Sequence, residues 1–476
     1  TFMGGGATLQ PAVNVNTVGG VPNSSWYTNR HYRYPLSLAA LRRGPNTEPG
    51  PVMNAPWRLV RTEGDGPLPL AVVQDATGRR FRLLFDAAAH PEMATGAAMI
   101  GSRLLHALGY NVPQHWLRYI RADRFVPAAD SVTQGDVDSL LAGTTRRPDR
   151  TYRVLVTRVS GVVRRIGPFR FRGTRADDAN DVFPHQHRRE LRGLRIFAAW
   201  MNHSKVRPRH TLDVGVEEDG RRFVRHYLTG LHLTLGSGGA KPKEPWSGHE
   251  HVLEVTEVLE RVATLGLSGG DWAETEPPNW PALGRFGTEG FEPRQWRPEW
   301  PNPAFQRCDS SDAFWAAKQV RHFSRADLAA IVGAADYSSP SVTNRVTVAL
   351  VRRRNAIARA YLGWGGGLAR FEVQGRRLIF DDLPARYGLA STGRRRAVTW
   401  HVFDNQQERV GQQLARTQSD REAIIIPSSS AAFLRGTLRT PTWGTTRVFL
   451  RRTAATRQQA YEVVGIERKG PGPSQF

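Results

Sequence analysis

The chain has 476 residues, of which 40% are hydrophobic and 23% charged, a composition that excludes a disordered or fibrous protein. No apolar run approaches the ~18 residues that a membrane-spanning helix needs, so we expect no transmembrane segment. The 66 Lys and Arg residues outnumber the 43 Asp and Glu residues, giving a formal net charge of +23. This charge favours anionic partners: an acidic protein surface, nucleic acid, an acidic glycan or an anionic membrane surface. The alternative is that arginine covers ordinary solvated faces, because basic residues are spread along the whole chain.

The single cysteine, Cys308, excludes an internal disulfide framework and any metal site built on cysteines. The chain begins at Thr1, so we expect that an upstream segment has been removed. A cleaved secretory signal would explain this start and would place the protein outside the cytoplasm, in the periplasm or associated with the envelope. A cytoplasmic location stays open.

Residues 1–56 are rich in Gly, Asn, Pro and Thr and have no helical periodicity, which predicts an extended N-terminal arm. Within the arm, residues 24–30 combine Trp26 and Tyr27 with turn-forming residues. Two large aromatic side chains in such a segment predict that it is anchored in a groove.

Residues 57–150 predict a first folded part of the chain. Strands are expected at 57–61, 70–74 and 80–85, and a turn is expected between the last two. A helix follows, with Ala97, Ile100, Leu104 and Leu108 on one face and Gly109 at its end. A fourth strand is expected at 116–120.

Residues 151–365 predict a second, larger part. Its expected elements are sheet at 151–172, a one-faced amphipathic helix at 187–201, a strand at 221–228, and helices at 311–333 and 340–363. Residues 270–305 are crowded with Trp, Pro and Gly, including Trp280, Trp296 and Trp300. A flexible linker would not carry so many large aromatics, so we expect an ordered, irregular belt packed on the core.

Residues 366–476 predict a small C-terminal β-rich domain, separated from the rest at Gly365-Gly366-Gly367. Five short strands with turn signals between them are typical of a sandwich or barrel. The expected strands lie at 368–373, 397–403, 422–426, 446–450 and 461–466.

Several motifs of the first two parts occur together in one known group of proteins. They are Leu84-Phe85-Asp86, Pro91–Ala97, Ala107–Pro113, Arg188–Trp200, the stretch Asn202–Asp213 and Thr234–Ser237. Together they resemble large exported or envelope-associated bacterial proteins of the atypical kinase-like group, distant relatives of the HipA-like and CotH-like kinases. The match covers residues 22–363. The resemblance implies an α+β, two-lobed protein-kinase-like fold, with a small lobe at 57–150 and a large lobe at 151–365.

The resemblance also implies five active-site positions, and this chain departs from the family at each of them. Leu84 stands where the family has the Lys that grips the nucleotide phosphates, and Ala98 where a helix Glu pairs with that Lys. Lys205 replaces the catalytic-loop Asp, His210 the metal-holding Asn, and Gly230 the Asp of the D-F-G triplet.

These departures predict a pseudokinase. Kinase catalysis depends on positioning and on charge neutralisation by metal ions and Lys. The loss of a general base alone costs ~10²–10⁴-fold in rate, and the loss of the metal-holding side chains removes the main source of charge stabilisation. We therefore expect a catalytically inactive scaffold without a cofactor, an accessory or structural subunit of a larger bacterial assembly that docks through basic surfaces.

Two alternatives remain. The chain is an anion-binding module for nucleic acid, anionic lipid or glycan, for which Lys205, Arg207 and Arg209 are the candidate anion site; or it is an unconventional phosphotransferase. Metal sites are weaker hypotheses. His185 with His187, His249 with Glu250 and His251, and Asp177, Asp178 and Asp181 with Asp213 have suitable donor atoms, but ordinary hydrogen-bonded roles are favoured for the histidines.

Overall fold

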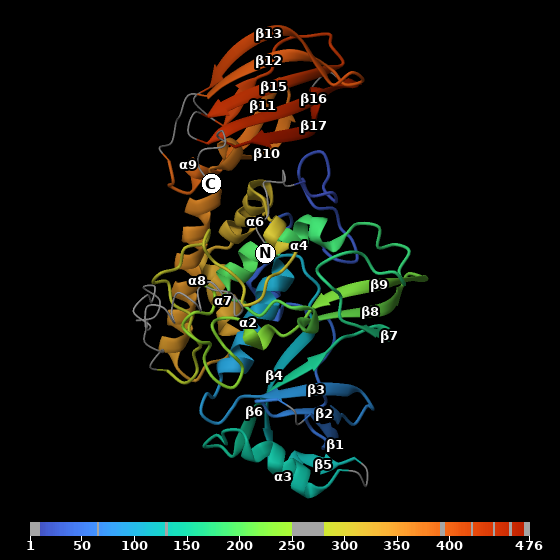
Figure 1. The fold of residues 1–476 in the computed structure, drawn as a ribbon, viewed down its shortest axis with the longest axis vertical. Coiled ribbons are helices and arrows are strands. Elements are labelled where there is room, and N and C mark those ends of the chain that lie inside the picture. The colour runs from blue at the N-terminus through green and yellow to red at the C-terminus, as the bar shows by residue number, and fades with distance from the viewer. Residues whose placement is uncertain are drawn as a thin grey trace, which may run out of the picture. The chain divides into compact units, whose positions relative to one another are not determined.

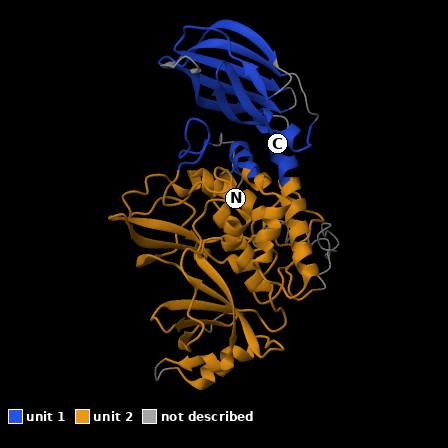
Figure 2. Ribbon diagram, turned by 180° about the vertical axis from the view of Figure 1, so that it is seen from behind, with its two compact units in different colours: residues 1–22, 308–318, 357–476 blue, residues 23–307, 319–356 orange. Residues whose placement is uncertain are grey.

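A computed structural model describes residues 10–63, 66–128, 132–249, 280–390, 396–419, 422–440, 443–456 and 459–470. The chain forms two compact units, each built from separate segments (Figure 2). The larger unit contains residues 23–307 and 319–356, and the smaller contains 1–22, 308–318 and 357–476. Helices and several sheets occur together, so the α+β class expected from the sequence is confirmed.

The larger unit contains a six-stranded sheet in the order β4-β6-β3-β2-β1-β5 (Figure 1). One face of the sheet packs into a core that includes Trp57, Phe81 and Phe85, and in β3 the first four residues alternate between exposed and buried. Its strands are β1 (Trp57–Thr62), β2 (Leu70–Gln74), β3 (Arg80–Phe85), β4 (Gln114–Arg121), β5 (Phe125–Pro127) and β6 (Thr151–Arg158).

Strand β6 corrects the boundary expected at residue 150. The strand pairs with β3 on one side and with β4 on the other, so it lies inside the sheet of the first part. The helix α3 (Gln134–Ala142) belongs to the same part and packs Val137, Leu140 and Leu141 into its core. The sequence analysis missed α3, although Thr133 and Asp136 form a capping box at its start.

Two helices at the centre of the larger unit are buried on all sides. In α2 (Met93–Ala107) every residue except His106 is buried, and in α4 (Arg189–Trp200) every residue except Arg195 is buried. Both helices were predicted and their expected apolar faces are buried; the other sides are buried as well, because neighbouring elements cover the rest of each surface. Gly109 follows α2 at a φ of +112°, and a Cβ there would lie 2.3 Å from the Tyr27 ring.

A three-stranded sheet follows in the order β7-β8-β9. Its strands are β7 (Val162–Gly167), β8 (Thr211–Glu218) and β9 (Arg221–Leu228). The stretch Asn202–Asp213 leads from α4 to β8, so its last three residues are strand rather than loop.

The helix expected at 311–333 is two helices, α6 (Ser310–His322) and α7 (Arg325–Gly333). Ser324 and Asp327 form a capping box that starts α7, which explains the break. The long helix α8 (Pro340–Tyr361) was predicted, and two of the four boundaries between the units fall within α6 and α8. Of the expected belt, residues 270–279 lie outside the described residues; in 280–305, Leu283, Phe286 and Trp296 are buried without regular structure.

The C-terminal part of the smaller unit is a sandwich of two sheets, in the orders β10-β11-β14 and β13-β12-β15-β16-β17 (Figure 1). Both sheets contribute to one core, in which Trp400 is fully buried. Eight strands are described where five were expected, because β11, β13 and β15 were missed. The strands are β10 (Leu368–Gln374), β11 (Arg377–Asp382), β12 (Arg396–Asp404), β13 (Arg409–Ser419), β14 (Ala423–Ile425), β15 (Phe433–Thr440), β16 (Gly444–Thr456) and β17 (Gln459–Lys469).

The expected arm is divided between the two units, with 1–22 in the smaller and 23–56 in the larger. Trp26 and Tyr27 are buried, so the anchored segment is confirmed. The remaining short helices are α1 (Leu38–Arg43), α9 (Leu383–Arg386) and the 3₁₀ helices η1 (Ala122–Arg124), η2 (His185–His187), η3 (Pro208–His210), η4 (Leu231–Leu233), η5 (Phe305–Arg307) and η6 (Trp364–Gly366). Within the described residues, every helix is too short or too polar to span a membrane.

Candidate functional site

A cavity of about 480 Å³ lies in the larger unit, between the six-stranded sheet, α2 and the β8–β9 hairpin. Four of the five substituted positions line it: Leu84 from β3, Ala98 from α2, His210 from η3 and Gly230 after β9. Lys205 is not among its lining residues. Segments far apart in the sequence therefore meet at one cavity.

The inner wall of the cavity is apolar. Leu84 and Ala98 are buried, and in the sheet Leu84 lies directly between Leu70 of β2 and Leu155 of β6, both of which also line the cavity. A Lys at position 84 would find no carboxylate among the described lining residues. Exchange of an ion pair for apolar packing is neutral or stabilising in many proteins, and the wall fits that exchange.

His210 and Gly230 form a second matched pair. Gly230 has a φ of +69°, and a Cβ at this position would lie 2.9 Å from Cγ of His210. The imidazole thus fills the space that a side chain at position 230 would need. Nδ1 of His210 contacts the carbonyl oxygen of Lys205, and the Thr229 amide donates to the His210 carbonyl at 2.9 Å. An Asp at 230 would fit only if this ring were removed.

The histidines around the cavity are held neutral. Burial lowers the pKa of His115 and of His232, both lining residues, to about 3. Burial lowers the pKa of His210 to about 4, against the opposing effect of the Lys205 carbonyl. His203, fully buried behind the loop, has its pKa lowered well below 6.5 for the same reason. At neutral pH these rings act as hydrogen-bonding groups without charge.

The rim of the cavity is basic. Arg82, Arg158, Arg165 and Arg209 line it, and among the described lining residues none is Asp or Glu. Arg82 pairs with Glu63 at 2.7 Å and Arg158 with Glu48 at 2.5 Å, whereas Arg165 and Arg209 have no ion-pair partner in the described ranges. Such a lining offers Mg²⁺ no carboxylate among its described residues, and it attracts anions.

The anion site expected from Lys205, Arg207 and Arg209 is divided. Only Arg209 lines the cavity. The guanidinium of Arg207 lies 4.7 Å from the ring centre of Trp300, and burial lowers its pKa. The basic rim found here therefore combines Arg209 with arginines of β3, β6 and β7 that were not part of the expected anion site.

The loop that carries Lys205 is fixed by buried polar contacts. Oγ of Ser204 bonds to Oε1 of Glu299 at 2.8 Å, and Nζ of Lys243 donates to the Asn202 carbonyl at 2.6 Å. Lys243 is buried, and burial lowers its pKa to about 7. Neither Lys243 nor Glu299 was foreseen. Both lie outside the motifs, and only their burial in the structure distinguishes them from other charged residues of the chain.

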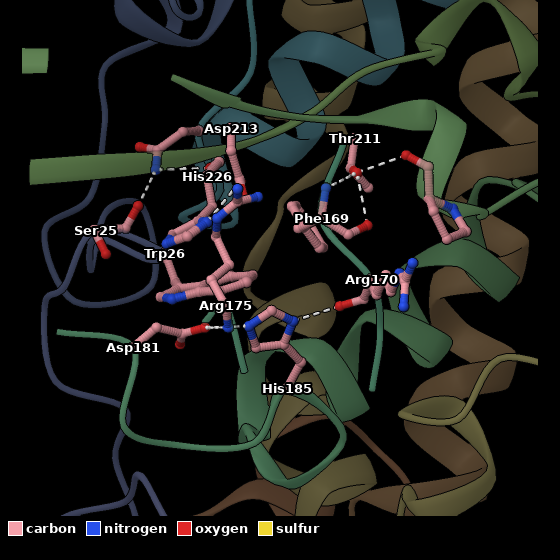
Figure 3. A network of polar contacts seen from close by, with 12 residues as sticks. Ser25, Trp26, Phe169, Arg170, Arg175, Asp181, His185, Thr211, Asp213 and His226 are labelled. Atoms are coloured by element: carbon pink, nitrogen blue, oxygen red, sulfur yellow. Dashed lines mark hydrogen bonds and ion pairs between the residues drawn. The ribbon is translucent and has the colours of Figure 1, made fainter. Parts of the chain in front are cut away.

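Two of the carboxylates that were considered as metal ligands, Asp181 and Asp213, belong to a polar network beside the arm (Figure 3). Asp213 contacts Nδ1 of His226 at 2.7 Å and the Arg175 guanidinium at 2.8 Å. Asp181 contacts Nε2 of His185 at 2.6 Å and Arg188 at 3.1 Å. Burial acts to raise the pKa of Asp181, but the bond to His185 and the other hydrogen bonds outweigh it and lower that pKa to about 2.

Asp181 and Asp213 are therefore paired with arginine and histidine side chains. In the described ranges, no group of three or more His, Cys, Asp or Glu is arranged to hold a metal ion. His187 is hydrogen-bonded to Arg192 at 2.8 Å, while Glu250 and His251 lie outside the described residues.

Trp26 of the arm closes this network. Its ring stacks on His226 with centroids 3.5 Å apart and meets His185 and Phe169 edge-on at 4.6 and 4.8 Å. The Arg188 guanidinium lies 4.8 Å from the Trp26 ring centre. Trp26 therefore contacts both halves of the network, and neighbouring arm residues add bonds to the same unit, such as that from the Tyr27 hydroxyl to Gln319 at 2.9 Å.

Searches against protein families, curated proteins and solved structures find no match to this chain. The kinase-like interpretation therefore depends on the motifs and on the cavity that they surround.

Proposed function

We propose that this protein is a catalytically inactive, kinase-like scaffold that serves as an accessory or structural subunit of a larger bacterial assembly. One observation carries the proposal: the described lining of the cavity joins four of the five substituted positions and contains no carboxylate. A two-lobed kinase-like arrangement of the larger unit is part of the proposal.

The chemistry of the cavity supports inactivity. Phosphoryl transfer needs an acceptor for the attacking hydroxyl's proton and carboxylates that hold the metal. Here Gly230 has no side chain, the neutral His210 fills its space, and the apolar pair Leu84 and Ala98 replaces the Lys–Glu pair. Positions 210 and 230 depend on each other, because an Asp side chain at 230 needs the space that the His210 ring fills.

The docking role rests on charge and on buried polar contacts. The net charge of +23 suits an acidic partner, and extracytoplasmic association with the envelope remains part of the proposal. The loop that carries Lys205 is fixed by buried contacts with Lys243 and Glu299. A loop held in one conformation suits a protein that acts by binding a partner.

We expect ATP with Mg²⁺ or Mn²⁺ to give no metal-dependent rise in melting temperature of the full chain, because no described residue that lines the cavity carries a carboxylate. Thermal-shift titration measures this, with ATP plus EDTA as the reference. A metal-dependent rise would refute inactivity. The subunit role fails if the protein isolated from its native source runs alone as a monomer.

A matched gain-of-function variant makes this test sensitive. The pair His210→Asn and Gly230→Asp removes the imidazole and places a carboxylate in its space. A Mg²⁺-dependent shift that occurs in this variant and not in the native chain assigns the loss of metal binding to these two positions.

The basic rim favours a second candidate function, metal-independent binding of an anion. Arg165 and Arg209 have no ion-pair partner in the described ranges, and the neutral His115 and His232 offer hydrogen bonds further in. An unconventional phosphotransferase is less favoured, because the cavity offers no described carboxylate as a base.

We expect inorganic tripolyphosphate in EDTA to raise the melting temperature, and Arg165→Gln or Arg209→Gln to weaken its apparent affinity about ten-fold, as expected for loss of a charge-assisted hydrogen bond. Arg164→Gln is the matched control, since Arg164 adjoins Arg165 on β7 but does not line the cavity. Equal weakening by the control would show that only net charge matters.

A further inference from the structure

The outer face of the five-stranded sheet in the smaller unit combines aromatic rings with arginines. Along β12, β15 and β16, alternate residues such as Trp400, Leu434 and Val448 point into the sandwich core. Their neighbours point to the other side of the sheet, since strand side chains alternate. We define the outer face by Phe403, Phe433, Phe449, Arg435, Arg447 and Arg451; the strands that carry it lie side by side in Figure 1.

The phenyl rings of the outer face are half-buried and lie outside the core. Phe403 and Phe449 meet edge-on with centroids 4.8 Å apart. Phe433 lies opposite Arg451 in the sheet, and Phe449 opposite Arg435. Ring and guanidinium therefore alternate across neighbouring strands, which is a pattern of planar surfaces beside positive charge.

The charge of this face is only partly neutralised. Arg447 pairs with Glu467 at 3.2 Å and Arg451 pairs with Glu462. Arg435 has no ion pair in the described part of the chain. Burial and the nearby Arg447 lower its pKa, against the opposing effect of Glu467. A negatively charged ligand would relieve this crowding of cations.

Three polar atoms at the centre of the face are buried and have no hydrogen-bond partner in the described ranges: Nδ1 of His401, Nε of Arg435 and Oγ1 of Thr437. His401 lies directly opposite Arg435, and Thr437 is two residues further along the same strand, opposite Arg447. Neighbouring side chains cover these atoms, so they make the centre of the face polar just beneath its surface.

We propose that the outer face binds single-stranded nucleic acid, with phosphates at Arg435 and Arg447 and bases stacked on Phe403 and Phe449. A basic surface that follows the backbone and aromatic rings that stack on bases are the two parts of such sites. A duplex would offer its phosphates but would leave the rings without unpaired bases to stack on. This activity is separate from the scaffold role and does not depend on the cavity.

The test is fluorescence anisotropy of the full chain with labelled oligothymidine and oligouridine of about 20 nucleotides, between about 50 and 200 mM salt. We expect affinity that falls with salt. Arg435→Gln or Arg447→Gln should each lower the log–log slope by about 0.7, the contribution of one phosphate contact with a single strand. Arg377→Gln on β11 of the other sheet is the charge-matched control and should leave the slope unchanged.

Phe449→Leu separates stacking from charge, because it keeps most of the apolar volume but removes the ring. We expect about ten-fold weaker binding with an unchanged salt slope. If its melting temperature falls, Phe403→Leu takes its place. The proposal is overturned if oligonucleotides do not bind, if Arg377→Gln weakens binding as much as Arg435→Gln, or if both Phe variants bind as well as the native chain. Heparin binding that equals that of the oligonucleotide and ignores Phe449→Leu would identify a general polyanion surface and would also overturn it.

Discussion

The larger unit is expected to lose stability steeply as the pH falls from 6.5 to 5.5, well before carboxylates protonate. His115 and His203 are buried with pKa values of about 3 and well below 6.5, and in the unfolded chain a His has a pKa of about 6.5. Below pH 6.5 the unfolded state therefore binds protons that the folded state does not. The contribution is fully present above pH 6.5 and decreases as the pH falls towards the folded pKa values.

The expected loss at pH 5.5 is about 1.4 kcal/mol for each buried histidine, or about 3 kcal/mol for His115 and His203 together. His210 and His232, with pKa values of about 4 and about 3, act in the same direction. This is a large part of the 5–15 kcal/mol that stabilises a typical domain. Urea unfolding at pH 7.5, 6.5 and 5.5, followed by circular dichroism, measures it.

A His115→Gln variant provides the control. It is expected to be less stable at pH 7.5, because a buried ring is lost, but its stability should fall less with acid than that of the native chain. The same pH dependence in both proteins would contradict the assignment of His115.

Replacement of Trp26 by alanine is expected to reduce the free energy of unfolding by about 3–5 kcal/mol, the usual cost of truncating a buried aromatic residue. The side chain is 4% exposed and its ring contacts His226, His185 and Phe169. Its loss would also expose the Asp213–His226 pair to solvent. Urea unfolding with tryptophan-independent detection measures the change.

Trp26→Phe is the matched variant, since a phenyl ring can still stack on His226, and it should recover most of the loss. Limited proteolysis is expected to cleave residues 23–30 of Trp26→Ala much faster than those of Trp26→Phe. If the two variants are equally stable, the stacked ring does not hold the arm.

The sequence predicts elements well where the pattern is local. Strands 70–74 and 80–85 are confirmed to the residue, and the strand expected around 221–228 spans those residues, because apolar, β-branched and aromatic residues beside turn signals mark them. The break between α6 and α7 was missed, although Ser324 and Asp327 have the spacing of a capping box that starts a new helix. The position of β6 beside β3 and β4 was missed for another reason: strand order depends on long-range pairing, which a local pattern does not contain.

In the candidate site, too, local motifs identified some residues, whereas others were brought together only by long-range packing. The motifs identified Leu84, Ala98, His210 and Gly230, and these four line one cavity. Lys205 follows the same motif but does not line it, because its loop is fixed by Lys243 and Glu299 from distant segments. Arg82, Arg158 and Arg165 reach the rim only through the arrangement of the sheets, so no sequence motif could mark them.

The two units exchange chain segments in a way that bears on how the protein is made. The chain passes between them four times, after residues 22, 307, 318 and 356. In the smaller unit the amide of Ile466 donates to the carbonyl of Thr17 at 2.8 Å, so an early and a late part of the chain meet by backbone pairing. Domains generally fold in the order in which a ribosome releases them. Here residues 10–22 must wait until β17 has emerged, so the smaller unit closes last and a chain that stops before residue 357 cannot complete it.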